Sequence, residues 1–498
     1  MLKKRVFTWS VALIVPLMVV AACVVQRSPV TGTNRAYGYS WEEEKKLGAQ
    51  ADQQIQQQYG VYQNEELLNY VKNVGQSVLQ VSHMRREGTQ EKYRETEFHF
   101  RVLNSPIVNA FALPGGYVYV TRGLLSHIEN EAQLAVVLGH EIGHVAARHA
   151  SQRAFEQKIG QIALLGGAIA GQEIFGLPGQ SILDLGGAAA QLLFLQYSRD
   201  DERESDRLGV EYSAMKNYRA SEGAEFFGVL ERMSERSGQS IPSFLQTHPD
   251  PGERAKTIPE LARQWEQKGY NLTITDTEEY MNTIDGMVYG DNPREGFTRG
   301  GTFYHPDLKF QFPYPTDWTL VNQATQVVIF NKNQDAVMVL KIDAEAESPR
   351  TSVVSFTAQQ GITVLSQSET SSDGLNAYEA TASATMQGGE ELRLYVFAVE
   401  YDGNIYRFVT YTTAAQFDSY KTDFVNSTNN FRELNDPEIL NIRPVRLHIR
   451  RADRAATFKS FLPDNLPMDI TAEEVAIANQ VGLDDTIEEG TFLKIPVQ

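Results

Sequence analysis

The pentapeptide HEIGH at residues 140–144 constrains this chain more than any other feature, because it sets two histidines four residues apart in a helical pattern. Apolar residues recur at helical spacing and predict one helix over residues 129–155. Four residues turn a helix by about 400°, so His140 and His144 leave the same face. Two such imidazoles are half of a tetrahedral zinc site, and Glu141 between them can reach a metal-bound water as a general base. The alternative is a helix that merely exposes two histidines.

A third ligand must come from outside this helix. A further histidine in the metzincin spacing is excluded, because Ala147 and Ala150 stand where that pattern needs glycine and histidine. His149 follows His144 by five residues, off the ligand face, and is expected to be a surface residue or a neighbour that supports a ligand. The remaining option is a carboxylate from a second helix.

Candidate carboxylates lie in the acidic segment SRDDERESD at residues 198–206. Glu202 and Asp206 are one helical turn apart, so one can bind a metal while the other orients a ligand histidine. Acidic helix starts are usually solvated faces. From the residues alone, Asp200, Asp201, Glu202 and Glu204 therefore all remain open as ligands.

The composition limits how a metal can be held. The 498 residues include one cysteine, which excludes a disulfide framework and a cysteine-ligated metal site. Any metal must then be bound by histidines and carboxylates. A net charge of −18 lacks the basic footprint of a nucleic-acid-binding protein, so no nucleic-acid partner is expected.

The N-terminal segment indicates export. A basic start is followed by an apolar run to residue 20 that is short for a membrane span. It ends in Ala-Ala-Cys23, which resembles the lipobox of bacterial lipoproteins and implies a signal peptide at 1–22 with lipidation of Cys23. Residues 23–40 are expected to be a lipidated tether. Val24 stands where an inner-membrane retention signal has Asp, which favours the outer membrane by the same resemblance.

Further elements are expected along the chain. Residues 98–103 alternate like a strand, and 108–120 predict strand, Pro-Gly-Gly turn and strand. The Gly/Ala/Leu-rich stretch 159–196 has apolar runs too short to span a bilayer and favours a buried helical hairpin. Helices are predicted within residues 41–75, 202–212, 221–234 and 472–481.

The second half changes in composition. Residues 271–300 are polar and predict a linker, whereas 301–435 predict an α+β domain with a hairpin at Asp402-Gly403-Asn404. Residues 441–498 predict a small module that contains strands and a helix.

HEIGH followed by SRDDERESD resembles the zinc metallopeptidases of the CAAX-prenyl-protease type, metallopeptidase family forty-eight. The lipobox points to the periplasmic BepA- and LoiP-like lipoprotein branch. The resemblance implies one zinc per chain, held by His140, His144 and Glu202, with Glu141 as the base and Asp206 supporting a ligand histidine. It implies a multidomain chain whose mainly α, gluzincin-type metallopeptidase domain at 41–270 carries a small β-sheet.

The resemblance extends to other segments. His248 in Thr-His-Pro is similar to a family histidine that can approach the zinc, as a fourth ligand or as an oxyanion or regulatory group; otherwise it is a loop histidine. Residues 301–435 resemble PsbP- or Mog-like α/β domains, and 441–498 resemble LysM, a peptidoglycan-binding module. The strand near residues 118–121 is expected to pair with an extended peptide.

The sequence therefore predicts a membrane-anchored periplasmic zinc endopeptidase at the outer membrane. Its expected partners are unfolded or envelope proteins, the membrane through its lipid anchor, and peptidoglycan. The alternative is a non-proteolytic, chaperone-like or cell-wall-binding lipoprotein, against which the intact Glu141 speaks.

Overall fold

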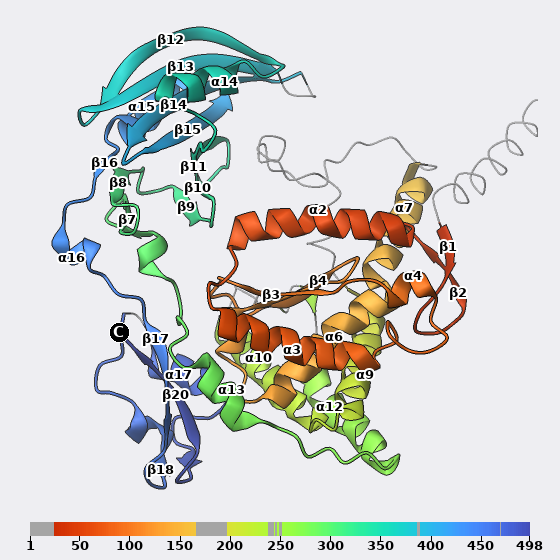
Figure 1. The fold of residues 1–498 in the computed structure, drawn as a ribbon. Helices are drawn as coiled ribbons and strands as arrows, with labels where there is room; N and C mark the ends of the chain where they lie inside the picture. The colour runs from red at the N-terminus through yellow and green to blue at the C-terminus, as the bar shows by residue number, and fades with distance from the viewer. Residues whose placement is uncertain are drawn as a thin grey trace, which may run out of the picture.

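The structure is a computed structural model that describes residues 24–165, 197–237, 244, 247–248, 251–385, 389–468 and 470–498. Figure 1 shows a helical region with a small sheet on the right, a sheet-rich region at the upper left and a C-terminal module at the lower left. The predicted signal peptide, Cys23 and nearly all of the hairpin expected at 159–196 lie outside the described residues. Within the described ranges, no helix has both the length and the apolarity needed to cross a membrane.

Helix α6, Glu131–Ala147, is the centre of the helical region, and every one of its residues is buried. It is apolar on nearly all sides, which is typical of a helix enclosed by others. Asn130 caps its start by accepting a hydrogen bond from the backbone N–H of Gln133. The neighbouring helices are α2 (Trp41–Tyr59), α3 (Glu65–Val81), α4 (Glu91–Arg94), α5 (Arg122–Leu125), α7 (His149–Leu165), α9 (Arg199–Met215), α10 (Gly223–Ser237) and α12 (Pro251–Gln267), with the short η1 (Ala220–Glu222).

Helices α6 and α9 cross at two glycines. A Cβ atom on Gly139 would lie 3.0 Å from Cα of Gly209, and a Cβ atom on Gly209 would lie 2.9 Å from the backbone nitrogen of His140. The backbones can approach this closely only because neither residue has a side chain. The crossing carries the first turn of α9 up to the histidine face of α6.

The single helix predicted over residues 129–155 is wrong, because the chain breaks at Arg148. This residue adopts a left-handed conformation (φ 63°, ψ 39°), which is uncommon for a residue other than glycine. Its buried guanidinium donates to Oε1 of Glu44 at 2.5 and 2.9 Å and to the carbonyl of Tyr39 at 2.9 Å. These contacts with the N-terminal part of the chain hold the break, and α7 begins in a new direction.

The segment expected to be a tether is instead a hairpin. Strands β1 (Val24–Arg27) and β2 (Asn34–Tyr37) pair antiparallel. The ring of Tyr37 is fully buried, with the guanidinium carbon of Arg148 3.7 Å from its centroid. The backbone N–H of Gly38 donates to the carbonyl of Ser151 at 2.8 Å. The chain is therefore fixed to the end of the α6 helix from its first described residues.

The small sheet has the order β3-β5-β4. The strand-turn-strand predicted at 108–120 is confirmed, with Gly115 and Gly116 at positive φ in the turn. Strand β5 is central, so the prediction that residues 118–121 pair with an extended peptide at a free edge is wrong; β3 and β4 are the two edge strands. The bounds are β3 (His99–Leu103), β4 (Ala110–Leu113) and β5 (Tyr117–Thr121).

The predicted linker at 271–300 is only partly a linker. It contains helix α13, Thr277–Ile284, and Tyr280, Met281 and Ile284 are buried in the same core as α6. The apolar spacing i, i+1, i+4 gives this helix one buried face within an otherwise polar segment. The turn η2 (Pro293–Glu295) and strand β6 (Phe297–Arg299) follow.

The sheet-rich region has the α+β character predicted for 301–435. Its antiparallel sheet has the order β12-β13-β14-β15-β11-β10-β9, with α14 packed on one face and α15 on the other. The predicted hairpin at Asp402-Gly403 joins β14 to β15. A second sheet has the order β16-β8-β7-β6. The bounds are β7 (Thr302–His305), β8 (Phe310–Pro313), β9 (Thr319–Asn322), β10 (Gln326–Phe330), β11 (Ala336–Ile342), α14 (Pro349–Thr357), β12 (Ile362–Ser372), β13 (Leu375–Thr385), β14 (Glu391–Tyr401), β15 (Asn404–Thr413), α15 (Phe417–Asn429) and β16 (Arg432–Glu433).

The C-terminal module pairs β17 with β20 and packs on the helical region (Figure 1). Nζ of Lys494, which is fully buried, lies 2.8 Å from the carbonyl of Ile128 and 2.7 Å from Oε1 of Glu129. The module thus contacts the chain just before α6 begins. Its elements are α16 (Pro437–Leu440), β17 (Arg446–Arg451), β18 (Ala456–Thr457), η3 (Phe458–Phe461), α17 (Ala472–Ala478), β19 (Thr486–Ile487) and β20 (Phe492–Val497).

Candidate metal centre

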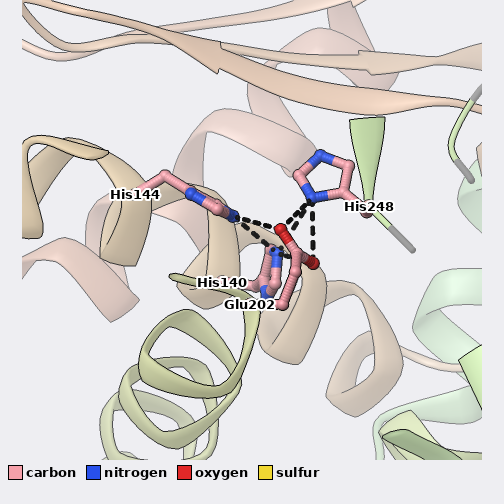
Figure 2. A group of neighbouring side chains, drawn as sticks. All are labelled: His140, His144, Glu202 and His248. Atoms are coloured by element: carbon pink, nitrogen blue, oxygen red, sulfur yellow. Dashed lines mark hydrogen bonds and ion pairs between the residues drawn. The ribbon is translucent and has the colours of Figure 1, made fainter. Parts of the chain in front are cut away.

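Four buried side chains from three parts of the chain converge on one point (Figure 2). His140 and His144 come from α6, Glu202 from the first turn of α9, and His248 from a turn that follows Phe244. One ligand atom from each of the four lies within 4.8 Å of the others. The two α6 histidines direct their Nε2 atoms to the same place, 2.9 Å apart.

Glu202 is the carboxylate that α9 presents to the histidines. Its Oε1 lies 3.3 Å from Nε2 of His144, and its Oε2 lies 3.6 Å from Nε2 of His140. Burial alone would raise its pKa, but His248 and the other basic neighbours hold the pKa of Glu202 well below its usual range. The carboxylate is therefore ionised and available as a ligand.

His248 lies among these ligand atoms. Its Nδ1 is 3.0 Å from Oε1 of Glu202 and 3.3 Å from Nε2 of His140. Its ring is fully buried and stacks on Phe244, with ring centroids 4.5 Å apart. Of the two sequence-based alternatives, a loop histidine and a histidine at the metal site, the structure places His248 at the site.

Glu141 is buried, and neither of its carboxylate oxygens has a hydrogen-bond partner within the described chain. Burial raises its pKa, because the charged form is poorly solvated there. Its Oε1 lies 3.7 Å from Nε2 of His248, which also has no hydrogen-bond partner among the described residues. Buried polar atoms are almost always satisfied, so these atoms mark the place of a water or substrate group.

Asp206 and Arg254 support the cluster from the side away from Glu141. Oδ1 of Asp206 lies 2.9 Å from Nδ1 of His140. The guanidinium of Arg254 donates to Asp206 at 2.6 and 3.0 Å and lies 3.2 Å from Oε2 of Glu202. Nη2 of Arg254 also lies 2.9 Å from Nδ1 of His140. When Nδ1–H of His140 donates to Asp206, Nε2 of His140 is free. Sequence reasoning missed Arg254 as part of the site, because an arginine in a polar helix reads as solvent-exposed.

The donor atoms of the site match a divalent cation. Glu202 and Asp206 are buried carboxylates whose basic neighbours hold their pKa values low despite burial, and Glu202 lies among the nitrogens of three histidines. The nitrogen and oxygen donors and the unsatisfied Glu141 together fit a bound metal ion.

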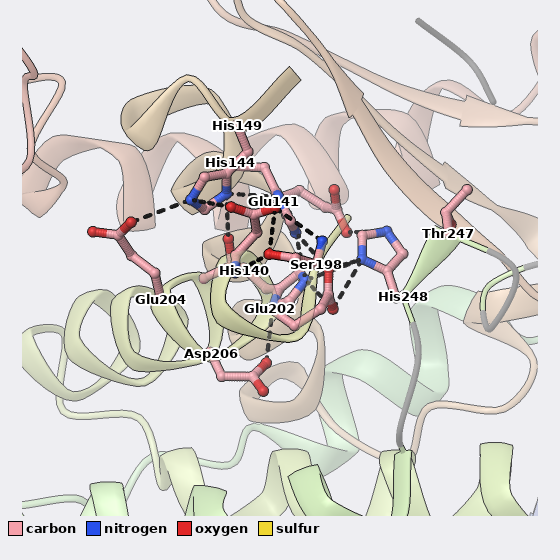
Figure 3. Close-up of polar contacts among 12 residues, drawn as sticks. His140, Glu141, His144, His149, Ser198, Glu202, Glu204, Asp206, Thr247 and His248 are labelled. Atoms are coloured by element: carbon pink, nitrogen blue, oxygen red, sulfur yellow. Dashed lines mark hydrogen bonds and ion pairs between the residues drawn. The ribbon is translucent and has the colours of Figure 1, made fainter. Parts of the chain in front are cut away.

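His149 is not a surface residue. It is fully buried, and its Nδ1 lies 3.0 Å from Nδ1 of His144, on the side of that ring that faces away from the cluster (Figure 3). On the other face of His144, the ring of Tyr197 stacks with centroids 4.0 Å apart. The helix break at Arg148 brings His149 back toward His144, which a continuous helix would not do.

Residues 69–262 match the model of peptidase family M48. This range contains all the residues of the cluster, and the matching model is that of the family predicted from the two motifs. The mitochondrial metalloendopeptidase OMA1 of Arabidopsis thaliana is 32% identical over 32% of this chain and 30% of its own length. The beta-barrel assembly-enhancing proteases of Yersinia pestis and Escherichia coli are 28% and 27% identical, each over 47% of this chain and 47% of their own length. The chain thus spans half or less of the length of these relatives. Their names support a metalloprotease.

Solved structures match part of the chain only weakly. Cyanobacterial PsbP from Synechocystis has 16% identity over 28% of this chain and 98% of its own length, with a TM-score of 0.24. The Ran-binding protein Mog1p of Saccharomyces cerevisiae has 9% identity over 26% of this chain and 93% of its own length, with a TM-score of 0.21.

Proposed function

We propose that this protein is a zinc-dependent endopeptidase. The observation that carries the proposal is the buried, unsatisfied carboxylate of Glu141 beside the converged His140, His144 and Glu202. Two histidines and a glutamate with one open position are the ligand set of catalytic zinc in peptidases. The donors here are histidine nitrogens and a carboxylate oxygen, with no cysteine sulfur. Catalytic zinc sites are commonly built from such donors.

The chain's own residues supply the proton transfers. Zinc, when bound, would lower the pKa of a water and polarise the scissile carbonyl. Glu141 accepts a proton from the attacking water and returns it to the leaving amine. Asp206 holds His140 in the tautomer whose Nε2 is free to bind the metal. Burial of the cluster keeps bulk water from competing.

His248 is proposed to occupy the position that a substrate would need. Its Nδ1 lies within 3.3 Å of both His140 and Glu202, among the ligand atoms themselves. A histidine there closes the open coordination position and restrains the enzyme at rest. The alternative is that His248 swings aside and stabilises the oxyanion of the transition state, and its variants separate the two roles.

The proposed substrates are extended segments of unfolded or envelope proteins. Strand β4 is one of the two edges of the small sheet, and its Ala112 and Leu113 line a small cavity together with His144 and Tyr197. An extended peptide that pairs with this edge would pass beside the metal centre. The name of the beta-barrel assembly-enhancing proteases supports an envelope substrate.

The location is proposed to be the periplasmic face of the outer membrane. Cys23 would carry the lipid, and the LysM-like module at 441–498 would bind peptidoglycan. Replacement Cys23→Ser should abolish labelling by a radioactive fatty acid and release the protein from membranes. If the variant keeps both its label and its membrane association, the lipid anchor is wrong.

The deciding experiment measures zinc and cleavage together. Purified protein should contain one zinc per chain by elemental analysis and cut an unstructured protein, and a chelator should stop the cleavage. Glu202→Gln should lose most of the zinc. Full zinc content in that variant removes Glu202 from the ligand set. Zinc without any cleavage would favour the chaperone-like or wall-binding alternative.

A further inference from the structure

His144 has an unusual neighbour on the side opposite to the proposed metal. A metal-binding histidine nearly always donates its second ring N–H to a carboxylate, a carbonyl or a water. For His140 that acceptor is Asp206, but for His144 it is another imidazole, His149, at 3.0 Å. Nε2 of His149 in turn lies 3.3 Å from Oε2 of Glu204 (Figure 3).

The carboxylate of Glu204, which contacts His149, determines which ring nitrogens of His149 and His144 carry a proton. Ionised Glu204 only accepts hydrogen bonds, so Nε2 of His149 must carry a proton and donate it. In the neutral imidazole, Nδ1 of His149 is then bare and accepts from Nδ1–H of His144. Nε2 of His144 then carries no proton, and this is the tautomer that can bind a metal. In this tautomer of His149, the hydroxyl of Ser205, 3.4 Å from its Nδ1, donates to that nitrogen as a second partner.

The break at Arg148 makes this arrangement possible. On an unbroken helix, five residues turn by about 500°, so His149 would point about 140° away from His144. The left-handed Arg148 instead turns the chain so that the two rings meet with centroids 5.0 Å apart. His149 is fully buried, and Glu204 also lies 3.6 Å from Arg35 of the N-terminal hairpin.

We propose that Glu204 and His149 form a relay that positions His144 for the metal, with His149 as a positioning residue and not a ligand. The proposal rests on the metal site of the proposed function. It predicts that the hydrogen-bond acceptor at Nδ1 of His149, and not its bulk, sets the affinity for zinc. Loss of such a partner typically costs about 10- to 100-fold in metal affinity.

The test compares two replacements of similar size in the purified full chain. In His149→Asn, Oδ1 stands where Nδ1 was and keeps the acceptor; His149→Leu keeps the branching but has none. Zinc affinity, measured by competition with a chromophoric chelator, should fall about 10- to 100-fold in His149→Leu and recover most of that loss in His149→Asn. The visible spectrum of the cobalt-substituted protein should change in the leucine variant alone.

Glu204→Gln serves as the second variant, because the side chain at this end of the relay is 22% exposed and glutamine is nearly isosteric, so the fold should persist. Its amide offers a donor as well as an acceptor, so the tautomer of His149 is no longer fixed and zinc binding weakens. Asp200→Asn, on the same turn of α9 but 92% exposed, is the matched control and should bind zinc like the wild type.

Two results overturn the relay alone: wild-type affinity in His149→Leu, or equal losses in His149→Leu and His149→Asn, which would indicate a purely structural role. If the wild-type chain itself binds no zinc, the proposed function fails, and the relay falls with it. Tight zinc binding by the wild type with unchanged relay variants leaves the proposed function standing.

Discussion

Among the carboxylates of the site, that of Glu141 has no hydrogen bond from the described residues, and its neighbours show what this leaves it free to do. The two α6 histidines and Glu202 can hold a metal without it, whereas none of the described residues uses its oxygens. Arg254 and Asp206 provide charge balance and orientation from the opposite side. At the scale of single residues, binding the metal and moving the proton are therefore separate tasks that substitutions can distinguish.

Glu141→Gln should bind zinc normally but should not cut. Glutamine is nearly isosteric, so the fold and the ligands persist, but it cannot accept the proton of water. Loss of general-base assistance is worth about 10²- to 10⁴-fold in rate. Turnover of an unstructured protein at matched zinc occupancy measures it. Cleavage at the wild-type rate would refute the metallopeptidase mechanism.

His248→Ala should change the rate without abolishing zinc binding, because three other ligands remain. A faster variant would mean that His248 closes the open position in the resting enzyme. A slower variant would mean that it serves the transition state. The same turnover assay decides between them, and loss of zinc from His248→Ala would show instead that the ring is an obligatory ligand.

At the scale of elements, the crossing of α6 and α9 fixes the distance between Glu202 and the histidines. The two helices meet at Gly139 and Gly209 with no room for a methyl group. Any separation at this point moves the first turn of α9 away from the metal centre. The crossing therefore links a packing requirement directly to the geometry of the ligands.

Gly209→Ala should destabilise the protein by about 1–3 kcal/mol, the usual cost of overpacking, and weaken zinc binding as well. Gly228→Ala is the control, because a Cβ atom there has no neighbour within 4 Å and alanine favours a helix by up to about 1 kcal/mol. Chemical denaturation and chelator competition on both variants test this. An unperturbed Gly209→Ala would mean that the helices can shift without affecting the site.

Local geometry made part of the site predictable. The i, i+4 spacing of His140 and His144 depends only on the helix that contains them. The choice of Glu202 needed more: Asp200 is exposed, Asp201 pairs with an arginine of α7 and Glu204 faces His149, which leaves Glu202 toward the metal. Only the packed helices show which acidic side chain faces the metal, because all of these residues lie within the first two turns of α9.

Long-range contacts explain what the sequence could not reveal. The break after α6 depends on Glu44, which lies 104 residues before Arg148. The approach of His248 to His140 joins residues 108 apart. By contrast, helix α13 had a readable signal in Tyr280, Met281 and Ile284, which its polar surroundings concealed.

At the scale of the whole molecule, the C-terminal module completes the helical region. Lys494 is buried against Glu129 and the carbonyl of Ile128, directly before the α6 helix. Nearby, Gln480 donates to the carbonyl of His127 at 2.8 Å and to Gln133 at 2.8 Å. The buried ion pair ties two distant parts of the chain together, and neither charge is tolerable there alone.

Glu129→Gln should destabilise the protein by about 3–5 kcal/mol at neutral pH, because it leaves Lys494 buried without its counter-charge. Burial lowers the pKa of Lys494 and Glu129 opposes this shift, so the pKa of Lys494 is lower still in Glu129→Gln. Between the folded-state pKa values of the variant and of the wild type, the folded variant holds fewer protons than the folded wild type, so the destabilisation should shrink as the pH rises through this window.

The double variant with Lys494→Met should recover most of the loss at neutral pH, since no charge remains buried. Denaturation at pH 7 and pH 9 on the single and double variants tests both expectations. A single variant as stable as the wild type would show that water reaches this contact.

The contact of Lys494 with Ile128 can form only late in synthesis of the chain. These residues are 366 positions apart, and a ribosome adds about 5–20 residues per second, so roughly 20–70 s separate their synthesis. Until strand β20 arrives, Glu129 stays unpaired at the entrance to the helix that carries HEIGH. A nascent chain therefore cannot complete the surroundings of this helix before strand β20 has been made.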